Sequence, residues 1–471
     1  MPGAAWPETR EGPFAKQDSL VNEPLTATCQ CIIAHPAKAK FLALRHSNGY
    51  LPPQIKVPED ASLATNVGHV LDGVRNKYGL RTTLLRHVAL FRDYHCIELE
   101  MHGKDARRME AIWVGLEDYR RMRGTDRHGY DPLAAWLEER ESGKTPPRRP
   151  PWERAGWFAE AGNWIQFQLD RLNLQITGSV AQHRALQHSA AVLRVPTSSG
   201  QLYFKAAYDK PPLESRLHAL LSRQWPEQVP AMLAVDHQRN WMLLPDLAPG
   251  SERQHGPGSL ARAAAAMGRI QAESTGILDA LQQAGCSEQG AAALEAFLRA
   301  DDFQQRIPEL PEAGLSEAER EDLGRAAGRL ADSCGRLADC GVPDTLVHPD
   351  FRAPNFFVGA DSVRIIDWED ASIAPPFFTL LELLREERPA ALAEPLRDPV
   401  VQAWMEPLAR SAGEEALQRG LDLALRLQPA WRLKRWIEEF DWLEPGSTTE
   451  INAWRFTTGL ARRLIAAETA G

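Results

Sequence analysis

The residues best suited to do chemistry lie close together in residues 345–370. His348, Asp350 and Asn355 form the pattern HxDxxxxN, and an apolar hairpin pattern then leads to Asp367. An aspartate on a loop can accept the proton of an attacking hydroxyl, so we assign this role to Asp350. Asn355 and Asp367 can hold one metal ion between the β- and γ-phosphates of a nucleotide. The pattern therefore predicts phosphoryl transfer, which depends on positioning and charge neutralisation.

This segment resembles the catalytic loop and metal-binding strand of the aminoglycoside phosphotransferase and choline kinase family. Members of that branch of the protein-kinase-like fold carry HGDxHxxN, followed by a strand that ends in Asp-Trp. The chain departs from the pattern at Pro349, where glycine is usual, and at Arg352, where histidine is usual. It also has residues 375–379, PPFFT, where many relatives place a further aspartate. The resemblance implies ATP and Mg²⁺ as cofactors.

Two further roles in this segment follow from the resemblance. Arg352 is similar to the basic residue that protein kinases carry two positions after the catalytic aspartate, so we expect it to neutralise charge on the γ-phosphate. His348 is expected to brace the loop rather than to act as a base or a ligand. The alternative for the whole segment is a plain β-hairpin with polar turns.

A kinase-like N-lobe also needs a lysine on a strand and a glutamate on the next helix. Lys205 lies in the apolar stretch YFKAA, and Glu214 follows nine residues later. The chain has ten lysines and 44 arginines, and only Lys205 and Lys210 fall between Lys144 and Lys434. We expect Lys205 and Glu214 to position the triphosphate, whereas the alternative is a solvated ion pair. Lys210 is expected on a loop surface.

The remaining nucleotide contacts are expected at both ends of the β-rich lobe. After Trp241–Leu244 the chain resembles a kinase hinge, and Pro245 has no N–H to donate. We therefore expect the Pro245 carbonyl to accept from adenine and the Leu247 N–H to donate to it. The turn over residues 178–183 has one glycine and stands where relatives have a nucleotide-covering loop. Ser179 and Gln182 are the weaker candidates for phosphate contacts there.

These residues need a fold that positions them, and the patterns predict an α+β, bilobal protein-kinase-like fold preceded by a small α/β domain. The predicted division is a tail over 1–24, a domain over 25–140, a Pro-rich linker over 141–152, a β-rich N-lobe over 153–247 and a helical C-lobe over 248–471. The predicted strands are Thr26–Ala34, Lys40–Arg45, Leu84–Phe91, Cys96–Met101, Glu110–Val114, Ser189–Thr197, Gln201–Ala207, Met232–Val235 and Trp241–Leu244, with a strand-rich stretch at Thr345–Asp367. The predicted helices are Ala61–Lys77, Pro132–Arg140, Leu213–Trp225, Leu260–Ala272, Gly290–Ala300, Glu317–Cys340, Glu414–Leu427, Pro429–Phe440 and Thr449–Glu468.

The first domain resembles the Nudix hydrolase fold, in which a helix carries the metal-binding glutamates of the motif Arg-Glu-hydrophobic-x-Glu-Glu-x-Gly. Aligned on Gly79, this chain has DGVRNKY over residues 72–78, so the glutamates are missing and Lys77 reverses one charge. The resemblance implies a domain that is inactive as a hydrolase and serves binding or docking.

Composition excludes several classes of protein. The chain has 471 residues, 44% hydrophobic and 25% charged, with a formal net charge of −9. It therefore lacks the basic field of a non-specific nucleic-acid binder and the composition of a disordered chain. No apolar run approaches a membrane span of about 18–20 residues. Six cysteines without zinc spacing suit a reducing cytosol, so a cytoplasmic protein is expected.

The predicted function is transfer of the γ-phosphate to a hydroxyl of a small molecule such as a sugar, an amino alcohol or an aminoglycoside-like metabolite. One alternative is a nucleotide-binding scaffold or sensor without activity. Another is a metal hydrolase built on His348, Asp350 and Asp367, which lacks a second histidine nearby. Most C-lobe tryptophans are expected in the core. The acidic run of Glu438, Glu439, Asp441 and Glu444 is expected on a solvated face.

Overall fold

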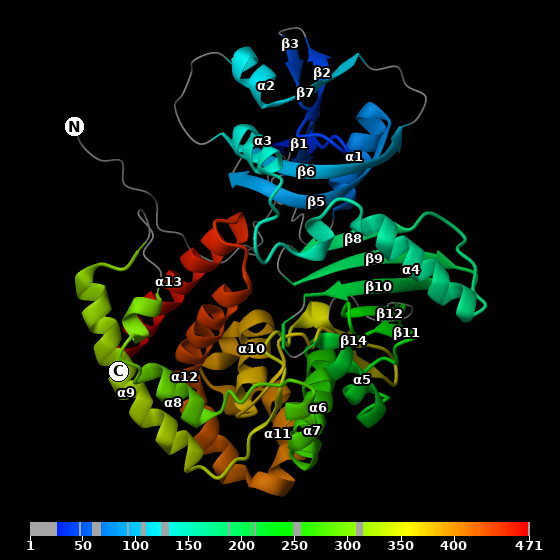
Figure 1. The fold of residues 1–471 in the computed structure, drawn as a ribbon. Helices are drawn as coiled ribbons and strands as arrows, with labels where there is room; N and C mark the ends of the chain where they lie inside the picture. Colours follow the sequence, from blue (N-terminus) through cyan, green and yellow to red (C-terminus); the bar gives the residue numbers. More distant parts are fainter. Residues whose placement is uncertain are drawn as a thin grey trace, which may run out of the picture.

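The chain folds into three packed parts (Figure 1). We describe it from a computed structural model, covering residues 26–46, 49–58, 67–91, 94–104, 110–123, 131–186, 189–208, 210–211, 213–247, 256–307 and 314–469. The predicted tail and the first turns of the Ala61–Lys77 helix lie outside these residues. The content of helices and antiparallel sheets is that of an α+β protein. Among the described residues, no helix has the length and apolar character needed to cross a membrane.

The N-terminal unit, residues 26–142, is built on two sheets. A four-stranded sheet has the order β4-β1-β6-β5, with β1 and β6 parallel, and a three-stranded sheet has the order β3-β2-β7. Its elements are β1 (Thr26–Ile33), β2 (Phe41–His46), β3 (Gly49–Leu51), β4 (Gln54–Pro58), α1 (Gly68–Tyr78), β5 (Leu80–Phe91), β6 (Tyr94–Lys104), β7 (Ala111–Val114), α2 (Leu116–Arg123) and α3 (Pro132–Ser142). Helix α1 ends at Gly79 with a φ of 67°, as the glycine predicted.

The β-rich unit, residues 157–247, has one antiparallel sheet of order β11-β12-β10-β9-β8. Its elements are α4 (Trp157–Arg171), β8 (Ala181–Leu186), β9 (Ala190–Thr197), β10 (Gly200–Ala207), α5 (Glu214–Gln224), β11 (Ala234–Asp236) and β12 (Trp241–Pro245). Strand β10 lies between β9 and β12, so the side chain of Lys205 emerges from the middle of the sheet. Helix α4 was not predicted, although Trp157, Ala161, Ile165 and Leu169 recur every fourth position and are buried.

The helical unit, residues 256–469, carries two small two-stranded antiparallel sheets between its helices. Its helices are α6 (Pro257–Ser274), α7 (Leu278–Gln283), α8 (Ala291–Leu298), α9 (Glu317–Ala338), α10 (Phe377–Glu387), α11 (Pro399–Ala412), α12 (Glu414–Glu439) and α13 (Thr448–Thr469). Its strands are β13 (Thr345–Val347), β14 (Phe356–Val358), β15 (Val363–Ile365) and β16 (Ser372–Ala374). The pairing of β14 with β15 confirms the predicted hairpin.

Helix α12 corrects the prediction of two helices separated near Pro429. The helix is continuous from Glu414 to Glu439 with the proline inside it. An internal proline removes one hydrogen bond and costs about 3 kcal/mol. Burial on both sides offsets this cost, because Leu427 and Trp431 are fully buried and the Trp431 ring stacks on Phe378 at 4.5 Å. Core packing therefore overrides the local signal for a helix end.

The Pro-rich segment 141–152 is packed between the units rather than extended as a spacer. Trp152 is buried, and the guanidinium of Arg149 is 6% exposed. Arg149 binds Glu139 of α3 at 2.9 and 3.1 Å and Glu444 of the helical unit at 2.5 and 2.6 Å. A second buried arginine, Arg86, extends this set of ion pairs. We call it the junction network, and its members are Arg86, Glu98, Glu139, Arg149 and Glu444.

Candidate active site

The loop between β13 and β14 holds Asp350 in a defined position. Asn355 ends the loop, and its side-chain amide donates to the carbonyl and to Oδ2 of Asp350, both at 2.8 Å. Arg352 Nε donates to the other carboxylate oxygen, Oδ1, at 2.7 Å. The side chain of Asp350 stays 40% exposed, so an incoming hydroxyl can reach it. The HxDxxxxN spacing thus brings the predicted base, its neighbouring arginine and its asparagine into direct contact.

The surroundings of Asp350 favour proton uptake. Burial raises the pKa of Asp350 above its usual value, although the positive charge of Arg352 opposes this shift. A base with a raised pKa accepts a proton more readily near neutral pH. The geometry and the pKa direction both suit the predicted role of this carboxylate.

Asp367 follows β15 in a strained conformation. Its φ is 71°, in the left-handed region that non-glycine residues rarely adopt. His348 stabilises this bend, because its Nε2 hydrogen-bonds the Ile366 carbonyl at 2.8 Å and its buried ring lies 4.7 Å from that of Trp368. The bracing position expected for His348 is thus the position it occupies. Backbone strain of this kind concentrates at functional sites.

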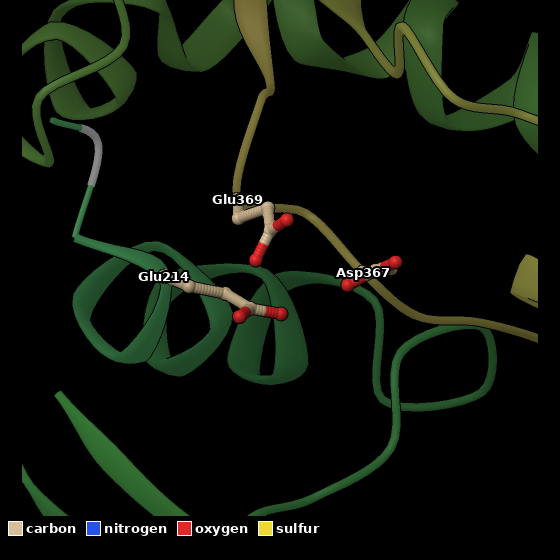
Figure 2. Close-up of side chains that lie close together, drawn as sticks. All are labelled: Glu214, Asp367 and Glu369. Carbon is tan, nitrogen blue, oxygen red and sulfur yellow. The ribbon is translucent and has the colours of Figure 1, made fainter. Parts of the chain in front are cut away.

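Lys205 joins the β-rich unit to the helical unit through its ion pairs. Its ammonium lies 2.7 Å from Glu214 at the start of α5 and forms a direct, shorter hydrogen bond with Asp367. Glu369 lies 3.6 Å away on the same ammonium. Figure 2 shows the three carboxylates converging from α5 and from the segment after β15. We call Lys205, Glu214, Asp367 and Glu369 the cleft cluster.

The electrostatics of the cleft cluster are dominated by one cation among three carboxylates. Burial would lower the pKa of Lys205, but the surrounding negative charges outweigh it and raise that pKa well above the usual value. Burial also raises the pKa of Glu369, and its Oε2 has no hydrogen-bond partner within the described residues. For Asp367, the charge of Lys205 overcomes burial and lowers the pKa. The cluster therefore holds more carboxylate than its one ammonium can satisfy.

This donor set fits a divalent cation. Ligand oxygens of Glu214, Asp367 and Glu369 all lie within 4.8 Å of one another. Mg²⁺ prefers oxygen ligands and is bound through one or two carboxylates together with substrate phosphates. Asp367, predicted as a metal ligand, is part of this set. Asn355 is the second predicted ligand. Its backbone carbonyl accepts a hydrogen bond at 3.0 Å from the N–H of Ile366, the residue before Asp367.

Sequence reasoning missed Glu369, and a signal for it was present. Glu369 lies two positions after Asp367, in a short run of acidic residues beside the predicted metal ligand. The run Asp367-Trp368-Glu369-Asp370 therefore offered a second candidate carboxylate for the metal site.

The prediction for Lys210 was wrong. Its side chain is 7% exposed, and its ammonium lies 2.9 Å from Asp370 and 2.7 and 2.8 Å from the two oxygens of Glu439. These partners are 160 and 229 residues away in the chain, so the flanking Asp209 and Pro211 carried no information about them. Lys210 therefore joins the loop before α5 to the C-terminal end of α12.

The residues predicted to contact the nucleotide differ in exposure. Pro245 ends β12, where it pairs with Leu202, and both it and Leu247 are partly exposed. Ser179 is exposed ahead of β8. Gln182 is wrong as a phosphate contact, because it lies in strand β8 rather than in a turn, and its buried amide is bonded to Leu84.

The acidic run at the end of α12 follows the expectation of a solvated face in part: Asp441 is exposed, whereas Glu438, Glu439 and Glu444 form ion pairs. Glu439 binds Lys210, Glu438 binds Lys434 and Glu444 binds Arg149. These carboxylates are therefore committed to ion pairs that join parts of the molecule. The tryptophans follow the prediction in part, since Trp404 and Trp431 are core residues whereas Trp442 is 37% exposed.

The site defined by this geometry belongs to a phosphotransferase. Residues 182–418 match the family model described as "Phosphotransferase enzyme family". The chain therefore belongs to this family of phosphotransferase enzymes, which confirms the resemblance inferred from the catalytic loop.

Several solved structures are similar to part of the chain. A choline/ethanolamine kinase family protein from Mesorhizobium loti is 16% identical with a TM-score of 0.43, and the match covers 66% of this chain and 100% of that one. The choline kinase LicA from Streptococcus pneumoniae is 14% identical with a TM-score of 0.42, covering 64% and 99%. An ethanolamine kinase from Plasmodium vivax is 11% identical with a TM-score of 0.45, covering 67% and 91%. No curated protein matches the chain.

Proposed function

We propose that this enzyme transfers the γ-phosphate of ATP, with Mg²⁺, to a hydroxyl group of a small molecule. The observation that carries the proposal is the convergence of Lys205, Glu214 and Asp367, from three separate segments, within hydrogen-bonding distance. Such a set serves to bind a nucleotide triphosphate and its metal ion. Mg²⁺, when bound, would neutralise charge on the transferring phosphate, with Asp367 and Asn355 as its ligands.

The chain's own residues then divide the work. Asp350 accepts the proton of the acceptor hydroxyl at a carboxylate oxygen, and Asn355 orients that carboxylate through its amide. Arg352 lies on the same carboxylate and is free on its exposed side to neutralise phosphate charge. Lys205, held by Glu214, contacts the phosphates. Pro245 and Leu247 present a backbone acceptor and donor to the adenine, and Ser179 contacts phosphate from the loop above.

The acceptor belongs to the class of sugars, amino alcohols or aminoglycoside-like metabolites. We also propose that the domains divide as predicted, near 141–152 and 247, and that the first is a Nudix-like module without hydrolase activity. In α1 the side chain of Lys77 donates to the Gln54 carbonyl at 2.9 Å, and it stands where a metal-binding glutamate would. The positive charge of Lys77 disfavours metal binding at this position.

The test is ATP turnover with Mg²⁺ and a panel of hydroxyl-bearing metabolites. Replacing Asp350 with asparagine removes the base, so kcat should fall by about 10²–10⁴-fold while Mg·ATP still binds. The control is Asp361→Asn, an exposed aspartate on the turn of the β14–β15 hairpin, which should leave turnover unchanged.

A non-catalytic nucleotide sensor is the second candidate. It is favoured by the direct bond between Lys205 and Asp367, which engages both groups with each other. Saturable Mg·ATP binding without turnover, equal in wild type and Asp350→Asn, would establish the sensor and refute phosphotransfer.

A further inference from the structure

Gln182 joins the edges of two sheets. Strand β8 is the edge of the β-rich unit's sheet, and β5 is the edge of the N-terminal unit's four-stranded sheet. The Gln182 side chain accepts a hydrogen bond from Leu84 N at 2.7 Å and donates one to Leu84 O at 2.8 Å. A single amide thus supplies both hydrogen bonds that a neighbouring strand would have made to Leu84.

This contact is buried and specific. Gln182 is 5% exposed and Leu84 is 2% exposed, so water does not replace the amide. Losing it would leave two buried backbone groups of Leu84 without partners, which is unfavourable. Both strands are irregular here, with register shifts between Leu84 and Arg86 and between Gln182 and Arg184.

Other contacts hold the same two units together. Glu100 Oε1 accepts from Gly156 N, at the start of α4, at 2.7 Å. The rings of His102 and Phe158 lie 4.9 Å apart. The N-terminal unit therefore contacts the β-rich unit at strand β8 and near the start of helix α4. Figure 1 shows β5 lying beside β8.

The N-terminal unit and the linker also reach the helical unit. Arg149 bridges Glu139 of α3 to Glu444, which follows α12. Arg148 Nη1 donates to the carbonyl of Phe440 at 3.3 Å. The N-terminal unit, the linker and the helical unit surround a cavity of about 210 Å³ lined by residues of β5, α3, the linker and the segment before α13. The N-terminal unit therefore contacts both of the units that contribute residues to the cleft cluster.

We propose that the N-terminal unit is a strut for nucleotide binding, with Gln182 as its positioning residue. Strand β8 pairs with β9, and β9 pairs with β10, which carries Lys205, so fixing β8 supports the sheet that holds this lysine. Contact with the helical unit at the same time limits how far the two lobes separate. This inference rests on the proposed function, because it assigns the strut to the nucleotide side of the phosphotransfer site.

The test compares Gln182→Met with Gln201→Met in the full-length chain. Methionine keeps the length of the side chain and removes both hydrogen bonds. Gln201 lies in the same sheet, and among the described residues its amide bonds the neighbouring Leu202 carbonyl alone. We expect Gln182→Met to raise KM and Kd for Mg·ATP about tenfold, corresponding to the loss of roughly one net hydrogen bond. The KM for the acceptor should stay unchanged, and Gln201→Met should resemble wild type.

A second variant protects the test if Gln182→Met folds poorly. Glu100→Ala removes the contact to Gly156 at the other end of the interface and should raise the Mg·ATP Kd in the same direction by about threefold, as loss of a single, partly exposed hydrogen bond. The Kd is measured with a non-hydrolysable ATP analogue, so it does not depend on turnover. If wild type binds no nucleotide, the proposed function fails. If wild type binds and both variants bind equally well, the strut is refuted and the function stands.

Discussion

Two buried ion networks of similar make-up differ in how completely their charged groups are hydrogen-bonded. In the junction network, Arg149 makes two hydrogen bonds to Glu139 and two to Glu444, through all three guanidinium nitrogens, and Glu153 lies 3.7 Å from its Nε. In the cleft cluster, one ammonium faces three carboxylates, and Glu369 Oε2 has no hydrogen bond within the described residues. Arg149 thus hydrogen-bonds carboxylates from two units, whereas Lys205 leaves a carboxylate oxygen of Glu369 without a hydrogen bond, so that oxygen can bind a ligand.

The largest effect is expected from Lys205→Arg. The substitution keeps the charge, so the fold and the melting temperature should stay close to wild type. A planar guanidinium cannot take the place of a compact ammonium between Glu214 and Asp367, so kcat/KM should fall by at least about 100-fold. Steady-state kinetics and a thermal melt of the same preparation measure both. Full activity in this variant would show that arginine can replace Lys205, and the proposed difference between the two networks would be wrong.

The reverse pattern is expected from Arg149→Lys. A lysine can bind one of the two glutamates well and leaves the other buried without a full partner, so the free energy of unfolding should fall by about 2–4 kcal/mol. Below the melting temperature, kcat/KM should fall far less than in Lys205→Arg. Urea unfolding followed by tryptophan fluorescence gives the stability. An unchanged unfolding midpoint would show that the network is not a structural joint.

Lys210 provides an intermediate case, because it is a lysine whose bonds are closed. Lys210→Met would leave the carboxylates of Asp370 and Glu439 facing each other, and we expect kcat/KM to fall about tenfold as the two lobes lose this link. Lys210→Arg can bind both carboxylates and should stay within about threefold of wild type. If Lys210→Arg lowered kcat/KM as much as Lys205→Arg, the loss would follow from replacing any buried lysine, and not from the unpaired carboxylate beside Lys205.

The smallest effect is a shift of the pH profile. Because the base must be ionised, kcat/KM should rise with pH through the raised pKa of Asp350 and level off above it. The charge of Arg352 opposes that raised pKa, so Arg352→Gln should move the acidic limb to higher pH. The measurement is kcat/KM for the acceptor from pH 4 to 8. A limb that moves to lower pH would contradict the assigned direction.

The sequence predicted those parts of the site that depend on short stretches of chain. Asp350, Arg352 and Asn355 contact one another within five residues, and a hairpin of apolar strands leads to Asp367, so local pattern was sufficient. The Lys205–Glu214 pair was predictable because nine residues separate its members. The family match supports this half of the chain.

The rest depends on contacts that local pattern does not contain. The burial of Lys210 and the bond from Gln182 to Leu84 join positions 98 to 229 residues apart. Helix α12 continues through Pro429 because of its packing, which the proline signal did not reveal. By contrast, Glu369 and helix α4 had visible local signals, so they were predictable and were missed.

The burial of lysines in the second half of the chain has a practical consequence. After residue 144 the sequence has three lysines, and Lys205, Lys210 and Lys434 are all buried in ion pairs. Exposed lysines such as Lys38, Lys56, Lys77 and Lys144 lie in the first 144 residues. Amine-reactive labels or surfaces should therefore attach to the protein through its N-terminal unit. Immobilised in this way, the molecule would present its β-rich and helical units to solution with Lys205 unmodified.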